Sequence, residues 1–309
     1  MGKEIFYFLI FPGLLFSGIV GGFLSWFDRK ITARVQFRQG PPLLQPLYDF
    51  IKLLTKETLI PKNGSQFTFL IAPVLALFGA VISAVFILLP LFGIKTGFVG
   101  DLIVIIYLLN IPSLSFMIGA LASGNPLAAV GASREMKLIL SYEVPFLLVL
   151  ISIILKSGMS IKLSEIIAFQ AANGAFIGNI SGVIGFIVAL MCIQAKLGLV
   201  PFDMAEGEGE ICDGITIEFS GTTYALVNLA KYIMLFVLPA LVVGLFFAGM
   251  NFEGINILWS VLKVVLVVLL VTLVRNTNPR VRIDQAMRFF WIWMNLLAIV
   301  SIILAIFGL

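Results

Sequence analysis

Eight long apolar stretches dominate the sequence and decide what the chain can fold into. A membrane-spanning helix needs about 20 apolar residues, because the hydrocarbon core is about 30 Å thick and each helical residue advances about 1.5 Å. The stretches are continuous and lack the alternation of outer-membrane barrel strands. They cover residues 5–27, 67–92, 102–122, 138–155, 176–200, 222–248, 255–274 and 289–308. The sequence therefore predicts an all-α polytopic membrane protein with about eight transmembrane helices.

The composition agrees with a chain whose surface mostly faces lipid. Of the 309 residues, 61% are hydrophobic and 12% are charged, whereas soluble domains carry about 25% charged residues. The first apolar run is too long for a signal peptide, and no small-residue cleavage site follows it, so we expect it to be retained. We interpret residues 1–309 as a single membrane domain without a soluble module.

The distribution of Lys and Arg predicts the orientation in the membrane. Thirteen of the twenty lie in or beside the first, third and seventh loops, against four on the opposite side and three within spans. Because basic loops remain in the cytoplasm, we expect loops 1, 3, 5 and 7 there and both termini outside. Topology also accounts for the net charge of +4, which therefore gives no reason to expect a nucleic-acid partner.

The chain has too few metal-ligating residues to build most redox centres. The chain has no His, and its two Cys residues are Cys192 in the fifth span and Cys212 in the following loop. Two distant thiols without imidazole cannot build an iron–sulfur, zinc or haem site. We expect no metal, no redox cofactor and no catalytic residue in this chain.

Loop 1, residues 28–66, is long and begins with a basic segment that contains Arg29, Arg34 and Arg38. A stiff Gly-Pro-Pro corner at 40–42 follows. Residues 43–57 then show the helical spacing of apolar side chains, which predicts an amphipathic helix lying along the cytoplasmic interface. Such a helix either packs as a plug for the loop, frames an opening toward lipid, or docks a partner.

Loop 5, residues 201–221, gathers six acids with no basic residue between them. Like charges this close raise one another's pKa values, and partial burial adds to the effect. A coupling or docking loop, a solvated acidic loop and a calcium-type site are all compatible with this composition. The six acids are Asp203, Glu206, Glu208, Glu210, Asp213 and Glu218.

Ionisable residues inside spans are costly and are functional candidates by default. Glu143 lies in the fourth span, close to the helix-breaking Pro145. Lys231 lies about three turns into the sixth span, and we expect both residues to belong to one internal polar chain. Lys196 lies near the cytoplasmic end of its span, where we expect its ammonium group to reach toward the interface.

Four segments together resemble the respiratory complex I subunit 1 family, and especially the corresponding membrane subunit of energy-converting, membrane-bound nickel-iron hydrogenases. The similarity covers nearly the whole chain, since the segments occur in the family's order between matching spans. They are DRKITARVQFRQGPP (28–42), GASREMKLILSYEVP (131–145), GLVPFDMAEGEGEICDGITIEFSG (198–221) and RVRIDQAMRFFW (280–291).

The resemblance implies a subunit that joins a peripheral redox arm to ion-pumping, antiporter-like membrane subunits. Iron–sulfur clusters and a nickel-iron or related site would then lie in hydrogenase- or dehydrogenase-like partner subunits. A carboxylate path in the family maps onto Glu143 and the loop 5 acids, and we add Asp213 and Lys231 as candidates for ion coupling. The residues expected to dock the peripheral arm are Arg29, Arg34, Arg38, Arg134, Arg280 and Arg282.

Three departures from complex I proper bear on the substrate. The chain has Gly-Pro-Pro at 40–42 where complex I usually has Gly-Pro-Asn, lacks the Asn-Arg pair before Pro201, and has Lys231 where an acid is usual. The first two favour a hydrogenase-type or sulfur-reducing complex that moves H⁺ or Na⁺ over a quinone-chamber subunit. A stand-alone secondary transporter is a third hypothesis, but the chain shows neither internal repeats nor paired broken helices.

The orientation is testable by accessibility. Single cysteines placed within 58–66 and 201–221 should react with a membrane-impermeant reagent from the cytoplasmic side only, whereas positions in 157–165 should not. Labelling of 157–165 from the cytoplasm would overturn both the orientation and the resemblance on which the loop roles depend.

Overall fold

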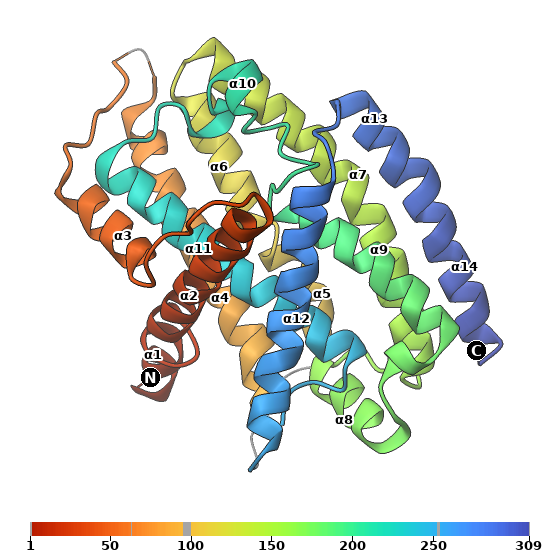
Figure 1. Ribbon diagram of the computed structural model, residues 1–309. Coiled ribbons are helices and arrows are strands. Elements are labelled where there is room, and N and C mark those ends of the chain that lie inside the picture. The colour runs from red at the N-terminus through yellow and green to blue at the C-terminus, as the bar shows by residue number, and fades with distance from the viewer. Residues whose placement is uncertain (1, 63, 95–99, 252–253, 309) are drawn as a thin grey trace.

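The computed structural model describes residues 2–62, 64–94, 100–251 and 254–308, and this part of the chain is helical with no strand. Its helices form a bundle (Figure 1), and several of them are long and apolar enough to cross a membrane. In chain order the elements are α1 (Gly2–Leu9), α2 (Leu14–Val35), α3 (Gln45–Thr55), α4 (Gln66–Leu91), α5 (Asp101–Leu108), α6 (Ile111–Ala122), α7 (Pro126–Lys156), α8 (Leu163–Asn173), η1 (Phe176–Gly178), α9 (Ile180–Lys196), α10 (Glu208–Ile211), η2 (Gly214–Thr216), α11 (Gly221–Phe246), α12 (Asn256–Thr277), α13 (Ile283–Arg288), the π-helix η3 (Phe289–Met294) and α14 (Asn295–Ile306).

The predicted all-α membrane fold is confirmed. Among the described residues, seven helical segments are long and apolar enough to cross a membrane, and α9 is a shorter apolar helix of 17 residues. That length is at the lower end of what spans a bilayer. The amphipathic helix expected at 43–57 is present as α3, which packs against α2 and α11.

Helix α11 occupies the centre of the bundle. It packs against α2, α4, α9 and α12, and most of its residues are buried, which explains why it is apolar on all sides. Its contact with α2 is close, since a Cβ on Gly21 would lie 2.0 Å from the backbone oxygen of Tyr232. Small residues permit such approaches between membrane helices. Lys231 is therefore carried by the central helix, and its side chain is partly exposed.

Several helices extend beyond the predicted spans. Helix α2 continues to Val35, so Arg29 and Arg34 are helical rather than part of loop 1. Helix α7 begins at Pro126, so Arg134 lies inside it. Apolar composition marks the hydrocarbon layer, but backbone hydrogen bonding carries a helix past that layer. The third predicted span is in fact two helices, α5 and α6, which meet at Asn110.

The odd-numbered loops gather at one end of the bundle. The hydroxyls of Thr58 and Thr222 lie 2.6 Å apart and join loop 1 to the start of α11. The amide of Val281 donates to the carbonyl of Pro201 at 3.2 Å and joins loop 7 to loop 5. This grouping agrees with the predicted common side, while the side of the membrane remains a prediction.

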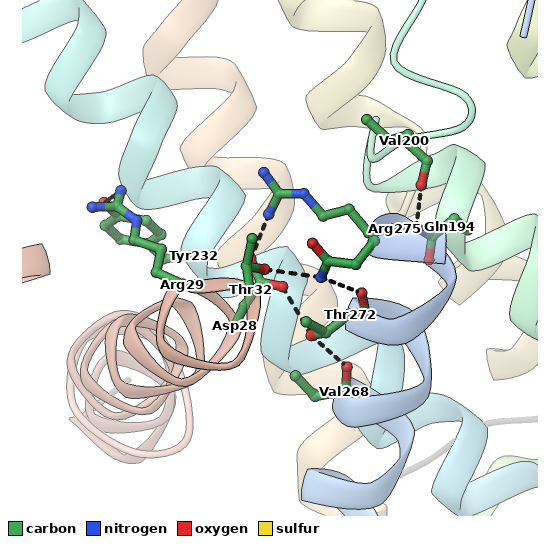
Figure 2. A network of polar contacts seen from close by, with 10 residues as sticks. Asp28, Arg29, Thr32, Gln194, Val200, Tyr232, Val268, Thr272 and Arg275 are labelled. Atoms are coloured by element: carbon green, nitrogen blue, oxygen red, sulfur yellow. Dashed lines mark hydrogen bonds and ion pairs between the residues drawn. The ribbon is translucent and has the colours of Figure 1, made fainter. Parts of the chain in front are cut away.

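A buried acid ties the first long helix to α12 (Figure 2). Asp28 on α2 is 6% exposed. Its carboxylate accepts from the Thr272 hydroxyl at 2.8 Å and from Arg275 Nη1 at 2.5 Å. On the neighbouring residue, Arg29 pairs with Asp49 of α3 at 2.9 Å and reaches the Tyr232 hydroxyl at 3.4 Å. The end of α2 is therefore fixed to α3, α11 and α12 by polar contacts.

The Asp28 contacts predict a measurable loss of stability. Asp28→Asn should lower the stability of the purified protein by about 1.5–3 kcal/mol, the range for hydrogen bonds to charged groups. The lower part of this range is expected, because the Arg275 side chain is 35% exposed. Thermal unfolding in detergent measures the change. Asp284→Asn removes an exposed acid and should leave the melting temperature unchanged; equal shifts for both variants would contradict the assignment.

Candidate functional site

The polar site begins in loop 5, where acids pair with bases from other elements. Asp203 forms an ion pair with Arg280 of loop 7 at 2.9 Å. Burial is the largest influence on its carboxyl group and raises the pKa of Asp203, while the charge of Arg280 opposes this. The Asp203 carboxyl group is therefore partly removed from water by burial and partly stabilised in its charged form by Arg280.

Glu206 and Lys231 form the inner pair. Their Oε1 and Nζ atoms are 2.5 Å apart, which joins loop 5 to the central helix α11. A third ionisable side chain, Glu135 of α7, lies close to both and hydrogen-bonds Ser113. Glu135 is 6% exposed. Two carboxyl groups, those of Glu135 and Glu206, therefore lie near Lys231.

Glu135 is a member of the site that the sequence did not predict. The fourth span was expected to start at residue 138, which assigned Glu135 to a loop, where an acid is unremarkable. The available signal was an acid one residue after Arg134 in the quoted 131–145 segment. Only the extension of α7 to Pro126 puts this residue inside the bundle.

A small cavity of about 40 Å³ connects these groups. Space of this size holds roughly three water molecules, at about 10–15 Å³ of such volume for each. Its wall includes both carboxylates, both lysines Lys196 and Lys231, and Asp203. The cavity therefore links loop 5, α7, α9 and α11 through one polar space.

The prediction that the Lys196 ammonium reaches toward the interface is wrong, because the side chain turns into the bundle. The side chain is 7% exposed, and Nζ donates to Asn110 Oδ1 at 2.6 Å. The ammonium also lies 5.5 Å from the ring centre of Tyr142 and 5.7 Å from that of Phe146, within the range of cation–π attraction. The lysine turns inward because Asn110 and two aromatic rings solvate it.

Asn110 connects Lys196 to Glu143. The amide nitrogen Nδ2 of Asn110 donates to Glu143 Oε1, while its oxygen receives the lysine. Asn110 lies between α5 and α6. The interruption of the third span thus places a neutral amide between a buried cation and an acid. Lys231 and Glu143 were expected to share one polar chain. In the structure the cavity leads from Lys231 to Lys196, and Asn110 then connects Lys196 to Glu143.

The remaining loop 5 acids lie farther out. Glu210 pairs with Arg134 at 2.8 Å, and Glu218 accepts from Asn125 Nδ2 at 2.6 Å. Asp213 is exposed, and the side chain of Glu208 lies outside the described part of the structure. Four of the six acids, Asp203, Glu206, Glu210 and Glu218, thus each have a base or an amide as partner. Across the described residues, no three His, Cys, Asp or Glu side chains come together as a metal site would require.

The six arginines expected to dock a partner fall into two groups. Arg29, Arg134 and Arg280 are ion-paired with acids of this chain. Burial alone would raise the pKa of Asp49, but the hydrogen bond from Arg29 and that from Gln45 outweigh it and hold the pKa below its usual value. The exposed members, for which the described residues give no ion pair, are Arg34, Arg38 and Arg282.

Comparisons with known proteins agree on one family. The family model described as NADH dehydrogenase matches residues 8–306. An NADH-quinone oxidoreductase subunit from Anoxybacillus flavithermus is 36% identical over 313 residues, covering 96% of this chain and 92% of the relative. The corresponding protein from Brevibacillus brevis is 33% identical over 300 residues, with 91% and 87% covered.

A solved structure has the same fold. A chain of the membrane-bound sulfane sulfur reductase, an archaeal respiratory membrane complex, superposes with a TM-score of 0.89 at 28% identity. The match covers 99% of this chain and 100% of that one.

The bridge through Asn110 predicts non-additive effects on stability. Lys196→Met and Glu143→Gln should each lower the melting temperature, because the first leaves Asn110 Oδ1 without its donor and the second removes the negative charge across the amide from the buried lysine. The double variant should lose less than the two single losses combined, with a coupling of about 0.5–3 kcal/mol for side chains in one network. As a control, Lys263→Met removes a lysine that donates to the carbonyls of Phe247 and Gly249, and it should add independently to Glu143→Gln. Additivity in both pairs would rule out the bridge.

Proposed function

The chain belongs to the NADH dehydrogenase family, and from this membership and the geometry of its polar site we propose that it is the non-redox membrane-anchor and coupling subunit of an ion-pumping, membrane-bound oxidoreductase complex. It would link electron transfer in a peripheral arm to H⁺ or Na⁺ translocation in the membrane. Because the fold matches a chain of a sulfur-reducing complex end to end, we place it in the sulfur-reducing or hydrogenase-type branch.

The observation that carries the proposal is the polar connection between the arginine-rich end and the interior. It leads from the Asp203–Arg280 pair through the cavity beside Glu206, and then by Lys196 and Asn110 to Glu143. An acid at the centre of a span costs about 2.5–3.5 kcal/mol on the insertion scale. Such a series of charged groups is unnecessary for anchoring alone, which supports a role in coupling.

The position of Glu143 indicates which surface of this chain would face the ion-pumping subunit. It is only partly buried and lies on a stripe of α7 whose other members, Leu140, Val144 and Leu147, are exposed. An acid in this stripe would face lipid if nothing covered it. We infer that an antiporter-like membrane subunit packs there and receives the electrostatic signal.

The opposite end would receive the redox signal. Exposed Arg34, Arg38 and Arg282 provide positive charge for docking hydrogenase- or dehydrogenase-like subunits, which would carry the iron–sulfur clusters and the nickel-iron or related site. A change of charge in that arm would first act on Asp203 and Glu206. Such a change of charge alters the populations of two conformations of the protein when each conformation favours a different charge state of these acids.

Residues 201–221 and the other odd loops would then lie in the cytoplasm, with the termini outside the cell membrane. A quinone-linked complex is the second candidate, because the curated relatives at 33% and 36% identity are NADH-quinone oxidoreductase subunits. Isolation of the native complex, with identification of its subunits and its electron acceptor, separates the two candidates. A chain isolated without oxidoreductase subunits would count against both.

Coupling is tested in the intact complex with Glu143→Gln. This change keeps the shape of the side chain and removes its charge, so the ion gradient formed per electron should fall several-fold while electron transfer to an artificial acceptor continues. Glu206→Gln should act in the same direction. Glu165→Gln alters an exposed acid on α8 whose partners are Lys162 and Ser160 and serves as the control. Full pumping by both test variants would falsify the coupling role, and loss of assembly would assign these acids to structure.

A further inference from the structure

A second, larger hollow lies between α12 and the α13–α14 segment and adjoins the coupling-site cavity at Phe202, which lines both. This groove has a volume of about 570 Å³ and is lined mainly by apolar side chains, a size typical of ligand pockets. It exists because its two walls pack on different neighbours: α12 contacts α2 and α11, whereas α14 contacts α7 and α9. Figure 1 shows α12 standing apart from α14, with α9 behind the space between them.

The floor of the groove continues along α9 toward the opposite end of the bundle. Ile180, Val183 and Ile187 are exposed, and Met191, which lines the groove, completes the stripe. Their spacing of three and four residues places them on one face of the helix. The stripe is about 16 Å long, since eleven residues separate its ends at about 1.5 Å each. An apolar chain in the groove therefore has a continuous track into the hydrocarbon layer.

The other end of the groove is cationic and interfacial. Arg275, Arg280 and Arg282 are chain neighbours of the lining residues Val274, Pro279 and Val281. Of these three, Arg275 and Arg280 are neutralised by Asp28 and Asp203. Arg288 lines the groove, is exposed, and forms no ion pair within the described residues. Trp293 lies on the same wall, and tryptophan prefers the level of the lipid headgroups.

The wall that carries these residues has an irregular backbone. Residues Phe289–Met294 form a π-helix between α13 and α14, and Phe289 and Trp293 from this segment line the groove. Short π-helical segments are frequent at functional sites. The extra residue in this turn changes which side chains face the groove.

We propose that this groove is a specific site for an anionic phospholipid, with one acyl chain along the α9 stripe and the phosphate beside Arg288. The unpaired positive charge selects this occupant over a neutral isoprenoid molecule, which would use the apolar track and leave Arg288 without a partner. A bound lipid of this kind would fill the space between α12 and α14 and hold these two helices at their present separation.

Photolabelling of the intact complex in nanodiscs tests the proposal. Phosphatidylglycerol and phosphatidylcholine with the same diazirine-bearing acyl chains are added separately at equal low fraction, and the labelled residues of this chain are mapped by mass spectrometry. Phosphatidylglycerol should label 180–191 about five-fold more strongly, as expected when one basic residue attracts an anionic headgroup. Arg288→Gln should abolish this preference, and Arg288→Lys should retain it.

Lys137→Gln is the control, because Lys137 is an exposed base on α7 that neither lines the groove nor belongs to the arginines assigned to docking. It should retain the preference. Equal labelling by both lipids in the unchanged protein would overturn the proposal, as would stronger labelling by a neutral photoreactive isoprenoid quinone. A photo-crosslinker at Ile187 that captures the polypeptide of a neighbouring subunit would also overturn it and make the groove a subunit interface.

Discussion

The hydrocarbon layer offers no water to a charged side chain, so the two lysines that enter this bundle from α9 and α11 depend on partners from other segments of the chain. Lys231 of α11 is matched by Glu206 of loop 5, and Lys196 of α9 by Asn110 and the rings of α7. These partners come from segments far apart in the sequence. The positions of the helices and the positions of the charges are consequently set by the same contacts, and the polar site cannot be separated from the packing.

The helical membrane fold could be predicted from the length of the apolar stretches, because the thickness of the membrane fixes the length of a spanning helix. The distribution of charged residues in the sequence said less about how deeply each charged side chain is buried. Lys196, four residues from the predicted end of its span, was near enough to water to extend outward, and only the three-dimensional position of Asn110 explains why it turns inward. Glu135 was missed for the related reason that α7 extends twelve residues before the apolar run begins. No local rule indicates that such an extension will be buried against α6 and loop 5.

Loop 5 illustrates the limit of composition most clearly. Six acids without an intervening base suggested mutual repulsion and shared protons. In the structure Asp203, Glu206 and Glu210 each have a base from a different element, namely loop 7, α11 and α7. The acids of loop 5 thus form separate ion pairs that hold loop 7, α11 and α7 around one small cavity. Sequence identifies the charged groups, but the pairing depends on a topology that brings 134, 231 and 280 to the same end of the bundle.

The amide of Asn110 has a consequence for how Glu143 and Lys196 communicate. A carboxyl group, an imidazole or a water molecule both accepts and releases protons, whereas a primary amide has donors at one end and an acceptor at the other. A proton cannot pass through it without an unfavourable tautomer. The lysine and the glutamate therefore exchange no proton through this amide, and in the proposed coupling role a change of charge on one would act on the other through its electric field.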